Sequence, residues 1–426
     1  MGVGQVQKEG ETMKRIGWKF VLLLAVVFLA GCGERLELEQ QAFVVAIGLD
    51  KGEKGNLVEV TFQISNPQVN TSQASEAQTE PPADIVTIAA TDLLSAKELA
   101  QSSLSRKITF SHLETIIIGE ELAKDDLFNN VIGSAIIDPE MRREAMMIVS
   151  KEPAQDFIHA NKPTMETRPH KYYAFMENNW EHTGYVPLSN LNTFFQRTDD
   201  ELFLAAYATA QKEPKEQEDD DTYLAGQVPQ ISGDPVQMMG SAILQRGRMV
   251  GTLDGEETRF SLLLRRKNLI ESMTASFPDP TNEEYRLSVI FTRTKNTKIQ
   301  VDTDRSPVKI NVTVPMKMRI NSNLSLQDFT RNKGKQKQLI ASVEERLEKK
   351  SDQLITKLQE EYGGEPFVWY AAARKHFWTM KQFEEYNWEK HFAKADVHID
   401  FVIEIDSFGE QIRPPTLKKG ETEQEQ

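Results

Sequence analysis

Apolar and polar residues alternate most regularly in the last third of the chain. Between residues 310 and 320 every second residue is apolar, the pattern of a strand with one buried face. Residues 397–405 repeat this pattern, and 287–291 and 299–301 are shorter segments of the same kind. Pro315 lies on the second, mostly polar face of the first strand. Its missing N–H predicts a sheet edge or a bulge at that point.

A helical period separates these strands. Residues 336–362 are predicted to form one long helix, which Gly363, Gly364 and Pro366 end. Its apolar stripe consists of Ile340, Val343, Leu347, Leu354 and Leu358. A second helical stretch is expected over 366–386.

The first third of the chain mixes strand and helix periods. Residues 43–49 and 57–64 flank the Gly-containing connection DKGEKGN and predict a β-hairpin. Residues 66–84 are polar and contain Pro, which is typical of a loop. Alternating helical and strand-like segments follow at 88–105, 108–110, 115–118, 121–137 and 146–149. This order indicates an α+β or α/β first domain.

The middle of the chain is less regular. Residues 201–210 (ELFLAAYATA) fit either a strand or a helix, because a short apolar run does not distinguish them. Residues 211–221 (QKEPKEQEDDD) predict a solvated acidic loop, and short apolar segments resume over 240–266.

Together these periods predict an α+β protein of three mixed α/β domains, the last with an antiparallel sheet and a long helix. The expected division is an N-terminal α/β domain over 32–165, a middle domain over 166–275 with the acidic loop 211–221, a C-terminal domain over 276–410 and a polar tail over 411–426.

The start of the chain has the pattern of a secretory signal peptide. Basic residues between Lys14 and Lys19 precede an apolar run of 11 residues over 20–30. This run is too short to cross a bilayer, which needs about 20 residues. We therefore expect residues 1–31 to be removed. Residues 1–12 look like an upstream start or a spurious extension, because the basic residues of a signal normally lie close to its beginning.

Cys32 closes this segment and is the only cysteine of the chain, so no intrachain disulfide can form. The sequence Leu29-Ala30-Gly31-Cys32 resembles a bacterial lipobox, in which the thiol receives a lipid and the peptide is cut before Cys. The alternative is an ordinary signal peptide with a chance cysteine. We favour lipid attachment at Cys32, which would hold the protein to a membrane.

Net charge and composition limit the kinds of partner that the protein is expected to bind. The chain carries a net charge of −14, and 39% of its residues are hydrophobic. An acidic body argues against nucleic acid and against electrostatic binding to anionic lipid. No second long apolar run follows the signal, so the body is expected to be globular and water-facing.

No catalytic, metal or cofactor motif stands out. None of the seven histidines is paired at i,i+3 or i,i+4, and no G-x-S-x-G, P-loop or Rossmann glycine pattern occurs. The best acidic cluster is Asp254-Gly255-Glu256-Glu257. It could serve acid–base chemistry or bind calcium, but an Asp-Gly turn whose Glu residues open a helix is the favoured interpretation. Aromatic residues crowd 367–392 and indicate either a membrane or partner surface or, as we favour, core.

Five segments in order resemble the Ger(x)C family, the lipoprotein subunit of spore germinant receptors. They are GCGERLELEQQAFVVAIGLDK (31–51), RKITFSHLETIIIGEELA (106–123), DPEMRREAMMIVS (138–150), GSAILQRGRMVGTLDGEETRFSLLLRRK (240–267) and the closing Trp-rich helix with its alternating strand. The segment 240–267 is the most recognisable. The resemblance covers nearly the whole chain after the signal.

This resemblance implies a three-domain α+β protein on the outer face of the spore inner membrane. It would act with two integral-membrane subunits, and the family has no established catalytic residue, so only Cys32 carries over as a functional position. Two alternatives from other classes are a lipid-anchored solute-binding protein of a membrane transporter and a surface hydrolase. The first would need two similar α/β lobes around a cleft, and the second a catalytic constellation.

Overall fold

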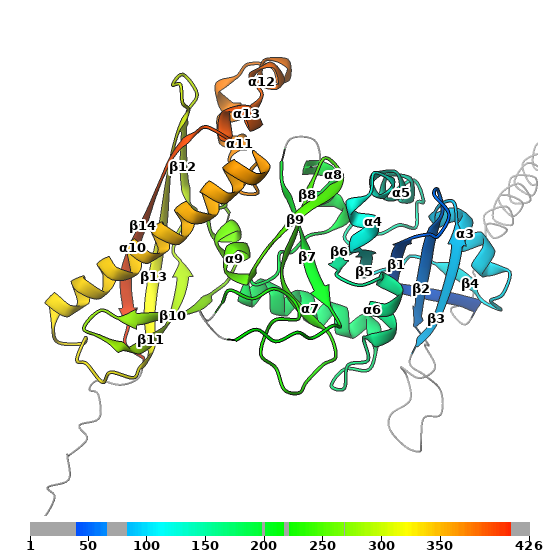
Figure 1. Cartoon of the computed structure of the whole chain (residues 1–426), viewed down its shortest axis with the longest axis horizontal. Helices are drawn as coiled ribbons and strands as arrows, with labels where there is room; N and C mark the ends of the chain where they lie inside the picture. Colours follow the sequence, from blue (N-terminus) through cyan, green and yellow to red (C-terminus); the bar gives the residue numbers. More distant parts are fainter. Residues whose placement is uncertain (1–39, 66–82, 198–200, 217–220, 268, 410–426) are drawn as a thin grey trace, which may run out of the picture.

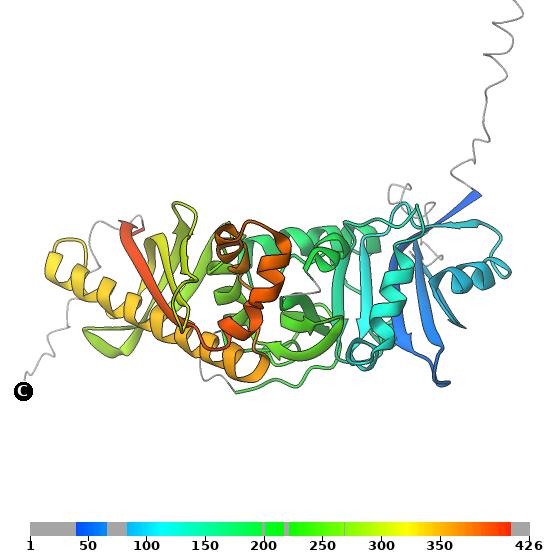
Figure 2. The same ribbon diagram turned by 90° about the horizontal axis from the view of Figure 1, so that it is seen from above.

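The computed structural model describes residues 40–65, 83–197, 201–216, 221–267 and 269–409. Two sheets lie side by side along the long axis of the molecule, and helix α9 (Gly255–Leu263) lies between them (Figures 1 and 2). Cys32, most of the predicted loop 66–84 and the tail 411–426 lie outside the described residues.

The first sheet has nine strands in the order β3-β2-β1-β5-β6-β7-β8-β9, with β4 beside β1. Its four central strands run parallel, and antiparallel strands extend it on both sides. The strands are β1 (Gln41–Lys51), β2 (Val58–Ser65), β3 (Ala83–Ala90), β4 (Lys107–Thr109), β5 (Thr115–Gly119), β6 (Met146–Ser150), β7 (Phe203–Thr209), β8 (Gln237–Gln245) and β9 (Arg248–Leu253).

Helices cover both faces of this sheet, which is why every residue of β5, β6 and β7 is buried. Successive residues point to opposite faces: Ile116 and Ile118 pack into one core, and Ile117 into the other. The first core is covered by α3 (Leu93–Gln101), α4 (Glu120–Lys124), α5 (Leu127–Ala135) and α8 (Leu191–Arg197), the second by α6 (Ala154–Ala160) and α7 (Pro169–Thr183).

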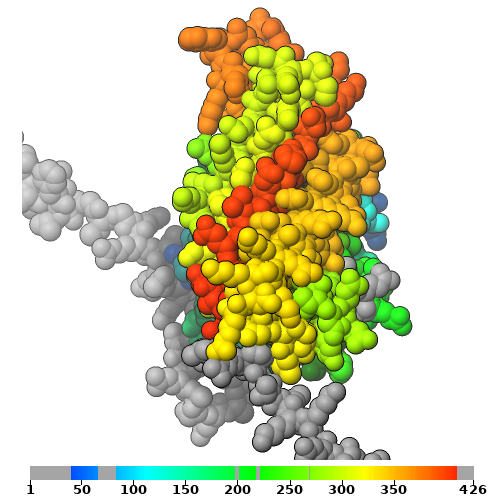
Figure 3. Space-filling model, turned by 90° about the vertical axis from the view of Figure 1, so that its left-hand side faces the viewer, coloured from blue at the N-terminus to red at the C-terminus, as the bar shows by residue number. Residues whose placement is uncertain are grey.

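The second sheet has five strands around β13, with α10 (Lys333–Lys357) packed on it. Its strands are β10 (Met273–Asp279), β11 (Asn282–Arg293), β12 (Lys298–Asp302), β13 (Lys309–Asn323) and β14 (Asp396–Ser407). The predicted alternation is confirmed, since Ile310, Val312, Val314, Met316, Met318 and Ile320 are all buried. The long helix is confirmed as well, with a π-helical turn at Leu358–Tyr362. Figure 3 shows α10 and β14 crossing this end of the molecule.

The second predicted helix, 366–386, is wrong as one element. It is divided into α11 (Tyr370–Ala373), a 3₁₀ turn at Arg374–His376 and α12 (Met380–Tyr386), and α13 (Trp388–Phe392) follows. The break occurs because Phe377 is extended and the Thr379 side chain caps a new helix. The prediction that this aromatic segment is core is confirmed for most of it, with Trp369, Trp388 and Phe392 buried, but Trp378 is exposed.

Pro315 occupies neither an edge nor a bulge, so that prediction is wrong. β13 lies inside the sheet, with β14 parallel on one side and the antiparallel strands β12 and β11 in succession on the other. On that side, β12 pairs with β13 as far as Thr313, and β11 pairs with it from Met316 onward. Pro315 therefore lies where one neighbouring strand replaces the other. A missing N–H is tolerated at such a junction because no ladder bond is expected there.

In the first third, the hairpin of β1 and β2 is confirmed. β3 was not predicted, because residues 83–90 fell between a polar loop and a helical pattern and the strand is only partly buried. The helix expected over 121–137 is interrupted near Asp125 and forms α4 and α5. Residues 201–210, which fitted either element, contain strand β7.

The α+β class, with a mainly antiparallel C-terminal sheet and a long helix, is confirmed. The expected boundary at 165/166 falls between β6 and β7, which pair in one sheet, and that at 275/276 falls within β10. The division into three domains stays a prediction.

Helix α10 also covers the outer edge of β14. The Glu344 carboxylate accepts the Ile403 N–H at 3.0 Å, and Glu348, one turn later, accepts the Phe401 N–H at 3.4 Å. Burial raises the pKa of Glu348. These carboxylates satisfy backbone donors that an exposed edge would offer to another chain.

We expect Glu344→Ala to lower the free energy of unfolding by about 1–2 kcal/mol, because the Ile403 N–H loses its acceptor. It should also promote self-association through the uncovered edge. Chemical denaturation and sedimentation velocity measure the two effects. Glu345→Ala, at an exposed position of the same helix, is the control; equal behaviour of the two variants would contradict the prediction.

Candidate functional site at the junction of the two sheets

The acidic cluster at residues 254–257 forms the start of α9. The Asp254 carboxylate accepts the Glu257 N–H at 2.8 Å, and the Glu257 carboxylate accepts the Asp254 N–H at 3.0 Å. This reciprocal capping box confirms the interpretation of the cluster as a turn and a helix start. Burial, and then the Glu257 charge, raise the pKa of Asp254 to about 6.

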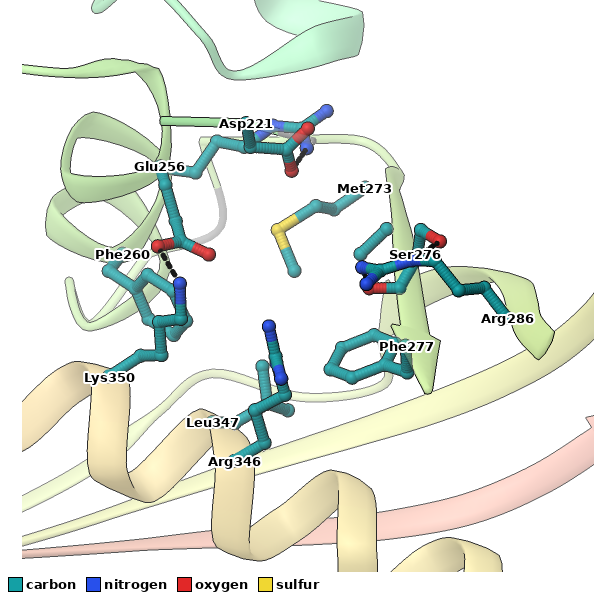
Figure 4. Close-up of a pocket in the computed structure, with 12 residues that line it drawn as sticks. Asp221, Glu256, Phe260, Met273, Ser276, Phe277, Arg286, Arg346, Leu347 and Lys350 are labelled. Atoms are coloured by element: carbon teal, nitrogen blue, oxygen red, sulfur yellow. Dashed lines mark hydrogen bonds and ion pairs between the residues drawn. The ribbon is translucent and has the colours of Figure 1, made fainter. Parts of the chain in front are cut away.

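The two glutamates of this cluster join α9 to α10. Glu257 lies 2.8 Å from the Lys357 ammonium, and Glu256 pairs with Lys350. Figure 4 shows Glu256 and Lys350 meeting across the gap between the two helices. Because all four side chains are mostly buried, these pairs fix how the long helix lies against the junction.

Arg259, in the second turn of α9, is a buried cation with partners on several elements. It is 3% exposed, and its guanidinium donates to Thr183 O (2.9 Å), Asp221 Oδ2 (2.6 Å) and Thr274 O (2.8 Å). It also lies 3.5 Å from the ring centroid of Tyr185, whose hydroxyl donates to Asp221 at 2.7 Å. One side chain therefore connects the end of α7, the end of the acidic loop, α9 and β10.

The far end of α9 is held by a half-buried arginine of β11. Arg293 of β11 donates to the carbonyls of Leu263, Arg265, Arg266 and Lys267. Leu263 O belongs to the last turn of α9, and the other three carbonyls lie in the segment that follows the helix. Burial lowers the pKa of Arg293 to about 10.

A small cavity lies beside Arg259, between α9, β10, β11 and α10 (Figure 4). Its volume is about 30 Å³, and apolar Phe260, Met273 and Phe277 share its wall with Arg286 and Arg346. A space of this size holds about one water molecule and no organic substrate. The junction is therefore a packed polar contact between two sheets.

A buried carboxylate that the sequence did not single out is Glu365, just after α10. It is 1% exposed and accepts the N–H groups of Phe367 (2.6 Å) and Tyr370 (2.9 Å) and the indole N–H of Trp388 (3.3 Å). Burial raises its pKa to about 7. The sequence indicated only that Glu365 follows the glycines that end the long helix.

The described residues contain neither a metal site nor a membrane-spanning helix. In the described ranges, no group of three or more His, Cys, Asp or Glu is placed to hold a metal ion. Likewise, none of the described helices is both long and apolar enough to cross a bilayer. The predicted lipid-attachment residue, Cys32, precedes the described part of the chain.

Two family models match most of this fold. "Spore germination protein N-terminal domain" matches residues 34–209, and "Spore germination B3/ GerAC like, C-terminal" matches residues 239–409. Together they define the class of protein: a spore germination protein with both of these regions. The chain belongs to the Ger(x)C family, as its sequence predicted.

Curated relatives agree with this assignment. Spore germination protein B3 of Bacillus subtilis (strain 168) is 22% identical over 406 residues, covering 94% of this chain and 99% of that protein. Spore germination protein KC of the same organism is 30% identical over 146 residues, or 34% of this chain, and putative spore germination protein YfkR is 32% identical over 155 residues, or 35%. The chain spans only 36% and 39% of the lengths of these last two.

A solved structure titled "Crystal Structure of the GerBC protein" aligns with a TM-score of 0.49 at 18% identity, over 84% of this chain and 96% of the other.

The most recognisable segment of the sequence, 240–267, forms most of β8, all of β9 and α9. It therefore supplies the junction itself, including the capping box and Arg259. A Cβ at Gly251 in β9 would lie 2.2 Å from the Tyr362 hydroxyl, so a larger residue there would require the Tyr362 side chain to move.

We expect Arg259→Met to lower the free energy of unfolding by about 3–5 kcal/mol, because Asp221 loses its buried partner. Adding Asp221→Asn should cost less than the sum of the single changes, since the two groups are coupled. Chemical denaturation measures both. Arg246→Met, which breaks an exposed ion pair with Glu389, should cost less than about 1 kcal/mol; a similar loss in both Met variants would contradict the prediction.

Glu365 predicts a pH dependence. Its pKa is raised in the folded state from an ordinary value of 4.5 to about 7. The folded state therefore binds the proton more tightly, and the stability gained by protonation is lost as pH rises through about 7. Glu365→Gln, which stays neutral, should flatten the pH dependence of unfolding between pH 5 and 8. The conservative change Glu360→Gln is the control, and an unchanged slope in Glu365→Gln would contradict the prediction.

Proposed function

We propose that this protein is a lipid-anchored, non-enzymatic subunit of a nutrient germinant receptor. Cys32 would hold it to the outer face of the spore inner membrane, and it would act there through contacts with two integral-membrane subunits. The observation that carries this proposal is the pair of family matches, the first of which begins at residue 34, two positions after the predicted lipobox cysteine.

The polar groups at the junction support a function through protein–protein contacts, because each is already bound to a group within the protein. The carboxylates of Asp254, Glu256 and Glu257 all bind helix ends or lysines within the protein. The cavity beside them holds about one water molecule. Such an arrangement is typical of a structural connection, and it gives no room for a substrate to meet an acid and a base.

The transporter alternative has weaker support. A solute-binding protein would need two similar lobes around a cleft. Here a nine-stranded sheet covered by helices on both faces is joined to a five-stranded sheet with one long helix. The two bodies differ in strand number and in strand direction, and the contact between them is filled.

We expect spores without this protein to lose the response to one class of nutrient germinant while still germinating with agents that bypass receptors. Cys32→Ala should give the same loss, because the unlipidated protein detaches or remains as uncleaved precursor. Gly33→Ala, which leaves the lipobox intact, is the control. Germination rate, membrane fractionation and mass spectrometry of the N-terminal peptide are the measurements.

Two results would contradict this proposal. One is an unmodified N-terminal peptide beginning at Cys32 in the native protein. The other is complete loss of response in Asp254→Asn or Glu256→Gln at normal abundance, together with turnover by the purified protein. Each of these changes should only disturb the turn or the helix start, at a cost of about 1 kcal/mol, so the variants should accumulate and respond.

A further inference from the structure

Among the tryptophans of the aromatic segment near the C-terminus, one is exposed and two are buried. Trp378 is 94% exposed and Met380 is 51% exposed, whereas Trp369, Trp388 and Phe392 are at most 3% exposed. We call residues 374–381 (RKHFWTMK) the tip. It connects α11 to α12, which stand at one end of the C-terminal sheet in Figure 1.

The tip is held by its own contacts. The Phe377 ring packs inward, 5.5 Å from Phe383 and 4.8 Å from Tyr386 between centroids. The Arg374 guanidinium donates to Phe377 O at 2.6 Å. The Thr379 side chain accepts the Gln382 N–H in a capping box. Trp378 is therefore exposed on a turn whose backbone is held by hydrogen bonds and by the packing of Phe377.

The charge of the tip is opposite to that of the whole protein. The tip carries Arg374, Lys375 and Lys381 and no Asp or Glu, and residues 370–395 carry five Lys or Arg against three Glu, although the chain has a net charge of −14. Two acidic groups face this segment: Glu385 lies 3.9 Å from Lys381, and burial, followed by the charge of Asp304, raises the pKa of Tyr386.

We propose that the tip docks on an anionic bilayer surface, with Trp378 and Met380 in the headgroup region and Lys375 and Lys381 toward lipid phosphates. This inference rests on the proposed lipid anchor, which brings the protein to the bilayer. An indole has an apolar body and one N–H donor, which suits it to the boundary between headgroups and acyl chains. Lysine extends its ammonium to the phosphates while its stem stays on apolar surface.

Charge complementarity favours lipid over another protein as the occupant. The acidic body is repelled by anionic headgroups, so docking needs a local basic surface that faces them. The tip combines such a surface with exposed apolar side chains in one stretch of eight residues. Attraction of this kind falls off within a Debye length, about 8 Å at physiological ionic strength.

Tryptophan fluorescence tests the inference on the lipidated full-length protein in vesicles. Of the four tryptophans after the signal, only Trp378 is exposed, so lipids brominated near the headgroup should quench mainly its emission. We expect quenching in phosphatidylglycerol-containing vesicles, and less quenching in phosphatidylcholine vesicles or at 1 M salt. Trp378→Phe should abolish it. Trp180→Phe, which removes a tryptophan 4% exposed, should leave it unchanged.

Charge-reversal variants distinguish the contribution of the lysines from that of the Trp378 indole. Lys375→Glu with Lys381→Glu should remove the quenching, whereas Lys349→Glu, at an exposed position of α10, should not. Protein that floats with the vesicles but shows no Trp378 quenching would overturn the tip inference and leave the anchor intact. Failure to float would overturn the anchor, and with it the inference. Protection of Trp378 from aqueous quencher only when the integral-membrane subunits are present would assign the tip to a protein partner and overturn the inference.

Discussion

The burial of Arg259 is the constraint on which the arrangement of the two sheets depends. A guanidinium cannot be deprotonated in a protein, so its burial requires acceptors placed around it in advance. Here the acceptors come from three segments: Thr183 O at the end of α7, the Asp221 carboxylate and Thr274 O in β10. Moving one sheet relative to the other would leave a buried charge without its partners.

Helix α9 can occupy this position only because both of its ends are satisfied. It is buried on almost all sides, including Gly255, Thr258, Ser261 and Leu262. The capping box satisfies its first turn. At its last turn the Arg293 guanidinium donates to Leu263 O and to three carbonyls of the segment that follows. The C-terminal core is continuous through this helix, since Leu202 and Leu204 near the first sheet belong to the same apolar cluster as α10.

Elements with a local signal could be predicted from the sequence, and those that depend on distant partners could not. The alternation of β13, the stripe of α10 and the Asp-Gly cap are short-range patterns, and all three are confirmed. Arg259 carried no such signal, because Asp221 lies 38 residues away and Thr183 lies 76 away. Glu365 was hidden for the same reason, as its buried state depends on Trp388. The break in the helix at Phe377 has local causes that the helical spacing concealed: the Thr379 cap and the packing of the Phe377 ring on Phe383 and Tyr386.

The parallel pairing of β14 with β13 determines when the C-terminal sheet can form during synthesis. These strands pair along Lys309–Arg319, yet the chain between them runs through α10 and the whole aromatic segment. A parallel partner cannot be reached by a tight turn, so this long connection must be made before the ladder can form. During synthesis, residue 396 emerges only near the end of the chain. The C-terminal sheet can therefore be completed only after β14 has been made, which is later than every strand of the first sheet.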